Sequence, residues 1–400
     1  MWSVVAQLAV VLLVSLLACA ATAAASPPTG RWDGELVGGA PSGHLGNPGH
    51  NVPLLGNGYL GLVLASSSTG VGTHGVEFNG STIEFFLNTN GNWDCEPSKT
   101  GSLPPAVCSV RALGGLTINA VNATGAGRQL YGNASSFAAE QRMANGSLWT
   151  RRLGADGSSL ESQTWIHPEQ NLLLTTLTYL GPGGSSLSSG APVELALQLW
   201  TLGKTSHVRS SANSSCAFTG TGPHGGSCSR RYSDQLSVGD SYVAPWTALA
   251  NRIESGPPAI RSEVLNERCL NRFECVSTAT TTHELRPGET ITLITTAADN
   301  LLKGNAHDPA EDAATLAANY AAAEIAEASA AFWRGYWDAS SVQLPSRPAL
   351  ERMWYGSQYC TVGSTASAAV VQRMQGKLPP PGLYGPFATV SPPILPLSRP

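Results

Sequence analysis

Short runs of alternating apolar and polar residues recur through the middle of the 400-residue chain, and they constrain its fold more than any other feature. Residues 193–200 read VELALQLW, and residues 289–296 read ETITLITT, with the same period in their first half. Residues 162–167 and 171–180 are two further strand-like runs. A period of two places one face of a strand in the core and the other outside it. Because Gly, Pro, Asn and Ser separate the runs, we predict a mainly β fold, a large antiparallel sandwich at residues 51–305.

The composition changes near residue 308, where the chain becomes rich in Ala. Asp308, Pro309 and Glu311 form a helix start, with a capping Asp, a Pro in the first turn and an acidic residue three positions on. A second helix is predicted from Ser346 to Ser364. The expected segments are a signal peptide at 1–25, an extended lead-in at 26–50, the sandwich at 51–305, a helical linker at 306–345 and a further helical segment at 346–400.

The first 25 residues resemble a signal peptide. Residues 4–17 form a short apolar run, and small residues at 20–25 are suited to cleavage. No Lys or Arg precedes the run, so an uncleaved membrane anchor stays open as the alternative, although the run is short for a membrane span. We therefore expect a protein that is secreted or held in the endomembrane lumen, with no stable membrane span after signal cleavage.

Cysteine spacing indicates an oxidising compartment. Six of the seven cysteines after the signal peptide fall into close pairs, Cys95 with Cys108, Cys216 with Cys228, and Cys269 with Cys275. Six cysteines allow fifteen pairings, so these are candidate disulfides and the connectivity stays open. A zinc site is the rival interpretation, but no Cys-x-x-Cys or closely spaced His pair supports it. Cys360 is left over on the second predicted helix, where a buried thiol is favoured over a nucleophile.

Sequons for N-glycosylation occur five times, at Asn79, Asn122, Asn133, Asn145 and Asn213. None has Pro in the middle position, so each matches the acceptor pattern, which requires an exposed loop in a secreted protein. Beside an N-terminal signal and paired cysteines, the five sites form a consistent set. We predict a glycoprotein.

Several classes of function are disfavoured by the composition and motifs. The formal net charge is -4 and only 12% of residues are charged, so no nucleic-acid partner is expected. No G-x-S-x-G, phosphate-loop or H-E-x-x-H motif is present, and the eight histidines are scattered. The predictions are therefore no cofactor and no metal.

Acidic and aromatic residues are the remaining candidates for chemistry on a sugar. Hydrolysis of a glycosidic bond usually requires two facing carboxylates. The candidate acidic residues are Glu77, Glu84, Asp94, Glu96 and Asp338. No spacing singles out a pair, so the catalytic residues are unknown from sequence. Seven aromatic residues between Phe332 and Tyr359 are interpreted as core rather than as sugar-stacking faces. Asn57, Asn92 and Trp93 are expected in loops, from which they would reach a neighbouring site.

Three stretches resemble the six-hairpin glycosidases. Residues 52–61 read VPLLGNGYLG, similar to the opening of glycoside hydrolase family 95, the α-L-fucosidase family, and in its Gly56–Gly61 core to family 65. Residues 83–88 with the nearby 92–93 resemble a strand ending in Leu-Asn before a Trp in family 95. Residues 332–345 are similar to the helix that leads into the barrel of these enzymes, with 350–359 as the first barrel helix. Less specifically, 377–387 resembles a loop that enters their sugar pocket.

The resemblance implies a β-supersandwich, a helical linker and an (α/α)6 barrel that carries the catalytic groups. The chain departs from the pattern after Phe387, so we expect 346–400 to be a truncated start of that barrel and no family catalytic residue is carried over. The implied function is a glycoside-hydrolase-like protein of carbohydrate metabolism, inactive as this chain alone, with an oligosaccharide or polysaccharide as partner. The alternative is a non-catalytic secreted carbohydrate-binding or cell-surface sandwich protein.

Overall fold

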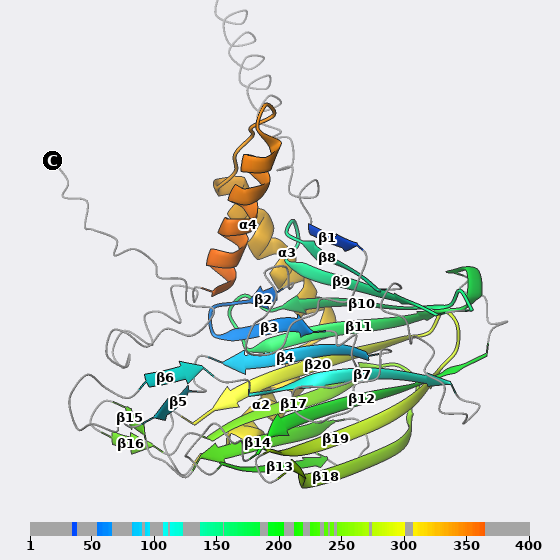
Figure 1. Ribbon diagram of the computed structural model, residues 1–400, viewed down its shortest axis with the longest axis vertical. Helices are drawn as coiled ribbons and strands as arrows, with labels where there is room; N and C mark the ends of the chain where they lie inside the picture. The colour runs from blue at the N-terminus through cyan, green and yellow to red at the C-terminus, as the bar shows by residue number, and fades with distance from the viewer. Residues whose placement is uncertain are drawn as a thin grey trace, which may run out of the picture.

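The described residues form a sandwich of two antiparallel sheets with three α-helices, and Figure 1 shows how they are arranged. The computed structural model describes residues 34–37, 54–65, 82–89, 93–96, 107–110, 113–122, 137–154, 156–184, 191–203, 212–218, 225–232, 236–238, 241–243, 246–271, 274–300 and 307–364. The residues expected to form the signal peptide lie outside these ranges, as do 377–387. The mainly β class predicted from the alternating runs is confirmed.

The larger sheet has nine strands, which are adjacent in the order β1 (Gly34–Val37), β8 (Phe137–Arg142), β9 (Ser147–Leu153), β10 (Ser159–Ile166), β11 (Leu172–Leu180), β20 (Thr290–Asp299), β17 (Trp246–Ser255), β14 (Gly226–Tyr232) and β13 (Ala212–Phe218). The second sheet has seven strands, in the order β18 (Ala259–Asn271), β19 (Glu274–Leu285), β12 (Val193–Leu202), β7 (Gly114–Asn122), β4 (Thr82–Thr89), β3 (Leu60–Ala65) and β2 (Leu54–Gly56). Two small ribbons pair β5 (Trp93–Glu96) with β6 (Val107–Val110), and β15 (Leu236–Val238) with β16 (Ser241–Val243).

The main core lies between the two sheets. Strand β12 shows how the sequence builds it, because Leu195, Leu197 and Leu199 are buried at every second position. Strand β11 differs, since apolar residues fill both of its faces. Leu173 and Leu177 join the main core, whereas Leu172 and Leu174 belong to a second cluster on the outer face of the nine-stranded sheet. Helices cover that outer face.

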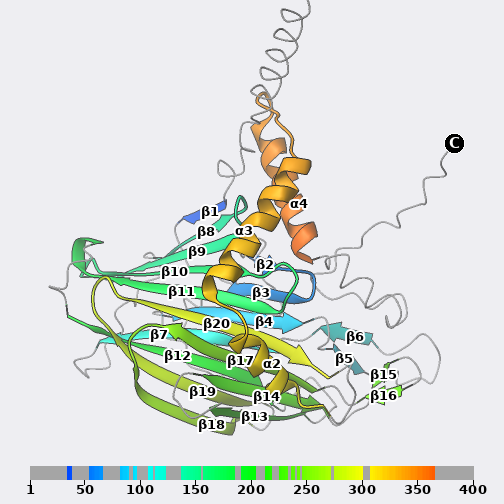
Figure 2. The same cartoon turned by 180° about the vertical axis from the view of Figure 1, so that it is seen from behind.

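Helices α2 (Pro309–Ala318) and α3 (Ala322–Ala339) lie along the outer face of the nine-stranded sheet, which Figure 2 shows from behind. Helix α2 begins as predicted, because the side chain of Asp308 accepts a hydrogen bond from the backbone N–H of Ala310 at 2.8 Å. The third helix, α4 (Pro348–Ser364), runs beside α3, and the two form a hairpin that projects from the sandwich (Figure 1). The helix predicted at 346–364 is thereby confirmed.

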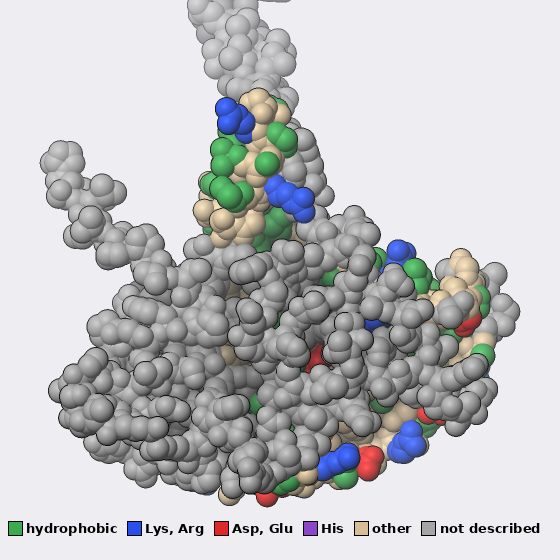
Figure 3. All heavy atoms as spheres, viewed as in Figure 1, with side chains coloured by type: hydrophobic (Ala, Val, Ile, Leu, Met, Phe, Trp, Pro, Cys, Tyr) green, Lys and Arg blue, Asp and Glu red, His purple; other side chains and the backbone are tan. Residues whose placement is uncertain are grey.

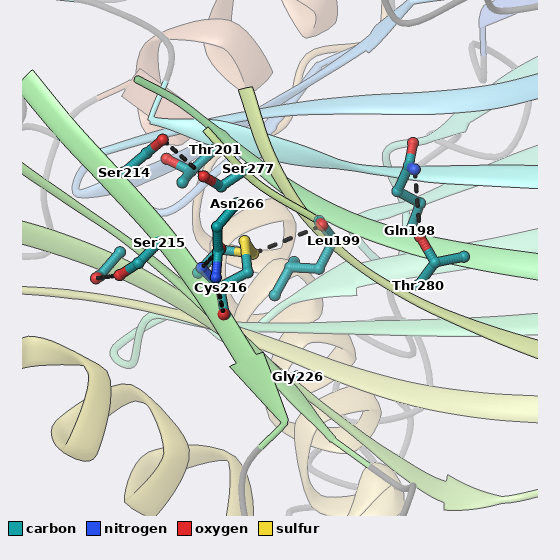
Figure 4. The surroundings of a disulfide bond; sticks show 12 residues. Gln198, Leu199, Thr201, Ser214, Ser215, Cys216, Gly226, Asn266, Ser277 and Thr280 are labelled. Atoms are coloured by element: carbon teal, nitrogen blue, oxygen red, sulfur yellow. Dashed lines mark hydrogen bonds between the residues drawn. A yellow bond between two sulfur atoms is a disulfide. The ribbon is translucent and has the colours of Figure 1, made fainter. Parts of the chain in front are cut away.

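Strand β13 ends the nine-stranded sheet, and side chains from β18 occupy its outer edge. The amide of Asn266 accepts from the backbone N–H of Cys216 at 2.6 Å and donates to the carbonyl of Cys216 at 3.2 Å, as drawn in Figure 4. The backbone N–H of Ser214 donates to the carboxylate of Glu267 at 3.3 Å. Glu267 has a positive φ of 49°, at an irregularity in the pairing of β18 with β19. This irregularity aims two consecutive side chains at a neighbouring strand edge.

Charged side chains line the exposed strand β18. Arg261, Glu263, Glu267 and Arg268 are all exposed along it. Figure 3 shows Lys or Arg and Asp or Glu side chains mixed along the lower border of the molecule. The same view shows hydrophobic side chains between charged ones on the projecting hairpin, where Leu350 and Met353 are exposed.

Candidate functional site

The Gly-Asn-Gly turn between β2 and β3 joins the two sheets. The Asn57 side chain is buried, and its amide nitrogen donates to the carbonyls of His167 at 3.0 Å and Gln170 at 2.9 Å. Its amide oxygen accepts from the backbone N–H groups of Tyr59 at 3.0 Å and Leu60 at 2.8 Å. A side-chain amide has two donor hydrogens and two acceptor positions, so all are in use. Asn57 therefore holds two turns together and has no atom left for a ligand.

The two glycines of this turn allow its backbone to lie directly against the end of helix α4. The backbone N–H of Gly58, which has a φ of 84°, donates to the carbonyl of Gly363 at 3.0 Å. A Cβ on Gly56 would overlap that same carbonyl. Only glycine combines a positive φ with so close a backbone contact. The Gly-Asn-Gly motif, on which the family resemblance rests, therefore forms the surface against which the end of α4 packs.

His167 lies in the β10–β11 turn at this junction. Its Nδ1 accepts from the backbone N–H groups of Glu169 and Gln170, both at 3.1 Å. Its ring meets that of Tyr320 edge-to-face, with the centroids 5.6 Å apart. Burial lowers the pKa of the imidazole, against a smaller opposing effect of Glu169. A neutral ring with Nδ1 already engaged orders the turn.

The aromatic residues of the helical hairpin form a stacked core. The rings of Trp333 and Tyr359 stack with centroids 4.4 Å apart, and Trp337 meets Tyr355 at 5.3 Å. All four are buried in the main cluster, and the indole N–H of Trp337 donates to the carbonyl of Met143 at 2.8 Å. The interpretation as core is confirmed for these four of the seven aromatic residues, whereas Tyr336 and Trp354 are half-buried and Phe332 is exposed. The four buried residues fasten the hairpin to the β8–β9 turn.

The candidate carboxylates do not come together as a pair. Asp338 is exposed near the end of α3, whereas Glu84 is buried on β4 in the seven-stranded sheet. Asp94 and Glu96 belong to β5, where the structure describes the backbone but not the side chains, and Glu77 lies outside the described residues. Two facing carboxylates are the usual requirement for glycoside hydrolysis, and the two candidates whose side chains are described, Glu84 and Asp338, do not form such a pair.

Asn92 and Trp93 were expected in loops. Asn92 lies outside the described residues, and Trp93 begins strand β5, which corrects the expectation of a loop at that position. The side chain of Trp93 lies outside the description.

Glu84 has the most perturbed carboxyl environment that the structure describes. It is 3% exposed, and its Oε1 has no hydrogen-bond partner among the described residues. Burial raises the pKa of this carboxyl to about 8. Because Ile83 and Phe85 point into the main core, Glu84 projects from the opposite, outer face of the sheet. A carboxyl held neutral at pH 7 in this way is a hydrogen-bond donor as well as an acceptor.

A row of polar residues continues from Glu84 across the outer face of the sheet. Strand register places Glu84 opposite Thr117, Thr117 opposite Gln198, and Gln198 opposite Thr280. The amide nitrogen of Gln198 donates to the hydroxyl of Thr280 at 3.2 Å, while its Oε1 is buried and has no partner in the described part of the chain. We name these four residues the polar row. Sequence reasoning missed it, because register between strands so far apart in the chain has no local signal.

Two of the candidate disulfides are present, between register partners on adjacent strands. Cys216 and Cys228 join β13 to β14 with an S–S distance of 2.04 Å, and Cys269 and Cys275 join β18 to β19 at 1.98 Å (Figure 4 shows the first). Cys95 and Cys108 are register partners in the β5–β6 ribbon, with side chains outside the described set. Cys360 lies on α4, and its side chain is likewise outside that set.

Three of the five sequons fall on described residues. Asn213 is exposed on the edge strand β13. Asn145 lies in the β8–β9 turn, where its Oδ1 accepts from the hydroxyl of Ser147 at 2.7 Å. Asn122 ends β7 with its side chain undescribed, and Asn79 and Asn133 lie outside the described residues. Asn213 has the surroundings that a glycan requires.

The part of the chain that the structure describes contains no cluster of three or more His, Cys, Asp or Glu side chains placed to hold a metal ion. None of the described helices is long and apolar enough to cross a membrane.

Comparison with known proteins gives a likeness in structure only. No protein-family model and no curated protein sequence matches the chain. A solved structure described as a kojibiose phosphorylase from the human microbiome is similar with a TM-score of 0.51 and 10% identity, covering 78% of this chain and 39% of that one. A family GH92 inverting mannosidase from Bacteroides thetaiotaomicron has a TM-score of 0.44 and 11% identity, covering 84% of this chain and 40% of its own.

At this identity the likeness shows the fold alone. The shared fold is a β-sandwich followed by helices, which is similar to part of the kojibiose phosphorylase structure. The chain spans about two fifths of the length of the solved structures that it matches.

Proposed function

We propose that the chain is the N-terminal sandwich portion of a glycoside-hydrolase-like protein of carbohydrate metabolism, in the six-hairpin group and akin to families 95 and 65. The observation that carries the proposal is the contact between the Gly-Asn-Gly turn and α4. Each residue of this motif makes a structural contact. Gly56 and Gly58 pack against the backbone of Gly363, and the side chain of Asn57 links the two sheets. The sandwich likeness to the kojibiose phosphorylase supports the same assignment.

The catalytic groups of such a protein would lie outside this chain. We propose the sandwich at 51–305, the linker at 306–345 and the start of a helical barrel from 346. Glu84 and Asp338 occupy separate elements, and the chain spans 39% of its neighbour's length. The chain alone should not hydrolyse glycosides, because the described candidate carboxylates, Glu84 and Asp338, do not face each other.

A panel of aryl fucosides, glucosides and mannosides tests this activity proposal on the purified chain. We expect no turnover above background. Turnover that survives purification and is abolished by a single carboxylate-to-amide substitution would place the catalytic site within the chain. The transcript beyond codon 387 is the companion test. We expect it to encode a helical continuation whose product cleaves a glycoside, and a longer product without such activity would count against the family assignment.

A second candidate function is non-catalytic carbohydrate binding, and the polar row favours it. The half-buried Gln198 and Thr280 at one end of the row carry an amide and a hydroxyl, which are groups that hydrogen-bond sugar hydroxyls. Binding of an oligosaccharide by the chain without turnover is the expected result under this alternative.

We further propose a secreted or endomembrane-lumenal glycoprotein with a cleaved signal peptide. The two disulfides and the exposed Asn213 support this compartment. Chain made in a eukaryotic secretory pathway should lose mass on glycan removal, with Asn213 among the occupied sites, and should contain three disulfides. An intact mass without glycan at any sequon would contradict the compartment.

A further inference from the structure

The two disulfides whose side chains the structure describes differ in their exposure to solvent. Cys228 is fully buried, and its partner Cys216 is 4% exposed. In the second disulfide Cys275 is buried, whereas Cys269 is exposed on β18. Exchange of a disulfide with a free thiol begins when a thiolate reaches one of the two sulfurs, so it requires access. Among these four cysteines, Cys269 is the one that an incoming thiol meets first.

The sheet holds the two cysteines of this second disulfide differently. Strand β18, which carries Cys269, is the edge strand of the seven-stranded sheet, and β19, which carries Cys275, lies between β18 and β12. The backbone N–H of Gly203, directly after β12, donates to the carbonyl of Cys275 at 2.7 Å. Cys275 is therefore enclosed between neighbouring strands, and Cys269 lies on the outer edge.

The residues just before Cys269 contact the edge of the nine-stranded sheet. Asn266 and Glu267 lie in the irregularity of β18, where neither has a register partner on β19. Asn266 bonds both the N–H and the carbonyl of Cys216 on β13, and the backbone N–H of Glu267 donates to the hydroxyl of Ser277 at 2.9 Å. The disulfide that follows is a covalent tie between this part of β18 and β19. Opening it therefore loosens the strand that carries Asn266.

We propose that the Sγ of Cys269 is a site of covalent modification by a small thiol of the glutathione class. The thiolate attacks this sulfur and forms a new S–S bond with it, while the bond to Cys275 breaks. The electron pair of the broken bond leaves with the sulfur of Cys275, which takes up a proton from water. One S–S bond replaces another, so no oxidant is consumed. The exchange is reversible, because the Cys275 thiolate attacks the mixed disulfide in turn and expels the small thiol.

A matched pair of single variants tests the difference between the two sulfurs. Cys275→Ser leaves Cys269 as a free thiol, and Cys269→Ser leaves Cys275 as one. Each folded full chain is incubated with oxidised glutathione at about pH 7.5, where part of an ordinary thiol is ionised, and the adduct is located by peptide mass spectrometry after an acid quench. Cys269 should form its adduct about tenfold or more faster than Cys275, because access limits the exchange. Thermal melting verifies that both variants are folded.

The unmodified chain tests the order of opening and its effect on β13. With excess reduced glutathione, the adduct should appear at Cys269 before Cys216 or Cys228 reacts. Hydrogen exchange in the peptide that contains residues 212–218 should then become faster by about fivefold, as expected for one lost hydrogen bond to the N–H of Cys216. Asn266→Ala is the matched control, since it removes that hydrogen bond while the disulfide stays closed, and it should raise the exchange to the same extent.

Three results would overturn the assignment of Cys269. They are equal rates of adduct formation in the two serine variants, opening of the Cys216–Cys228 bond as fast as the other, and no reaction until the chain is unfolded in urea. Unchanged exchange in β13 after the disulfide has opened would overturn its link to the edge of the nine-stranded sheet. If either serine variant melts below the assay temperature, the order of opening in the unmodified chain decides the assignment.

Discussion

The two outer faces of the sandwich differ in the residues that they carry and in whether helices cover them. On the nine-stranded sheet, Leu172, Leu174 and Ile294 meet Ala317 of α2 and Ile325 of α3 in an apolar cluster. On the seven-stranded sheet, Glu84, Thr117 and Gln198 lie beside a smaller apolar cluster of Trp200, Leu202 and Val276. The first face is thus apolar where helices of the same chain cover it, whereas the second combines buried polar and apolar side chains.

Polar groups under the helices illustrate the contrast. Arg252 of β17 donates to the carbonyls of Ala317 at 2.8 Å and Tyr320 at 2.7 Å, at the C-terminal end of α2. Its neighbour Glu254 accepts from Arg252 at 2.8 Å and from the backbone N–H of Ala322, at the start of α3, at 3.1 Å. A cation thus meets one helix C-terminus and an anion meets the next N-terminus, as the helix dipoles favour. Arg252 and Glu254 are thus matched to the helix ends, so removing either should destabilise the fold.

The largest effect is expected where α3 meets the β8–β9 turn. Gly146 has a φ of 65°, and a Cβ there would overlap the ring of Trp333. Gly146→Ala should therefore lower the free energy of unfolding by about 3 kcal/mol, since backbone strain and overpacking add together. Urea unfolding measures this change. A loss below about 1 kcal/mol would mean that α3 does not dock on this turn.

Arg252→Ala should have the next largest effect, a loss of about 2 kcal/mol, because two helix carbonyls and Glu254 lose their donor. Arg334→Ala on the exposed side of α3 is the control, and it should change the stability by less than about 0.5 kcal/mol. Equal losses of stability in the two variants would show that Arg252 contributes no more to the fold than an exposed arginine does.

The pH dependence of stability tests the outer face of the seven-stranded sheet, through the titration of Glu84. Because the pKa of Glu84 is raised from 4.5 to about 8 in the folded protein, the native state holds this proton more strongly than the unfolded chain. Its contribution to stability is therefore full below the unfolded value and is lost as pH rises toward 8, by up to about 1.4 kcal/mol per pH unit. The register partners Ala65 and Thr117 and the same-face neighbour Phe86 are not ionisable, so none of them shares this titration.

Urea unfolding at about pH 5 and about pH 8 tests this assignment, by comparing the unmodified chain with Glu84→Gln. The unmodified chain should lose more stability over that interval than the variant. Parallel pH profiles would show that Glu84 titrates normally and that its face is open to water.

The smallest expected effect is an increase in stability. Gly335 lies on the exposed side of α3, and nothing comes within 4 Å of a Cβ built there. Gly335→Ala should stabilise the chain by about 0.5–1 kcal/mol through helix propensity alone. The melting temperature reports it. A loss instead would show that a further surface covers this side of the hairpin in the folded protein.

Local patterns in the sequence predicted the elements well. Residues 193–200 alternate because one side of β12 faces the core, and Asp308 caps α2 as its position before Pro309 indicates. Close cysteine spacing also indicated two bonds that the structure contains, because each spans neighbouring strands of one hairpin-like pair.

The contacts between distant segments were beyond such patterns. Asn57 was expected to reach a neighbouring site from a loop. Instead, its side chain makes all of its hydrogen bonds with His167, Gln170 and the backbone of its own turn. Glu84 was one of several acidic candidates, and only the register with Thr117 and Gln198 sets it apart. Both features depend on which strands become neighbours, which is decided by the whole fold and not by any single stretch.

The amide of Asn266 has a consequence for how these molecules behave in a crowded solution. By bonding both the N–H and the carbonyl of Cys216, it does for the border of the nine-stranded sheet what another strand would do. An edge with unpaired backbone groups recruits strands from other copies, and this is a common start of aggregation. At β13 the backbone groups of Cys216 are already bonded to a side chain of the same molecule, so this residue offers no template to a strand of another copy.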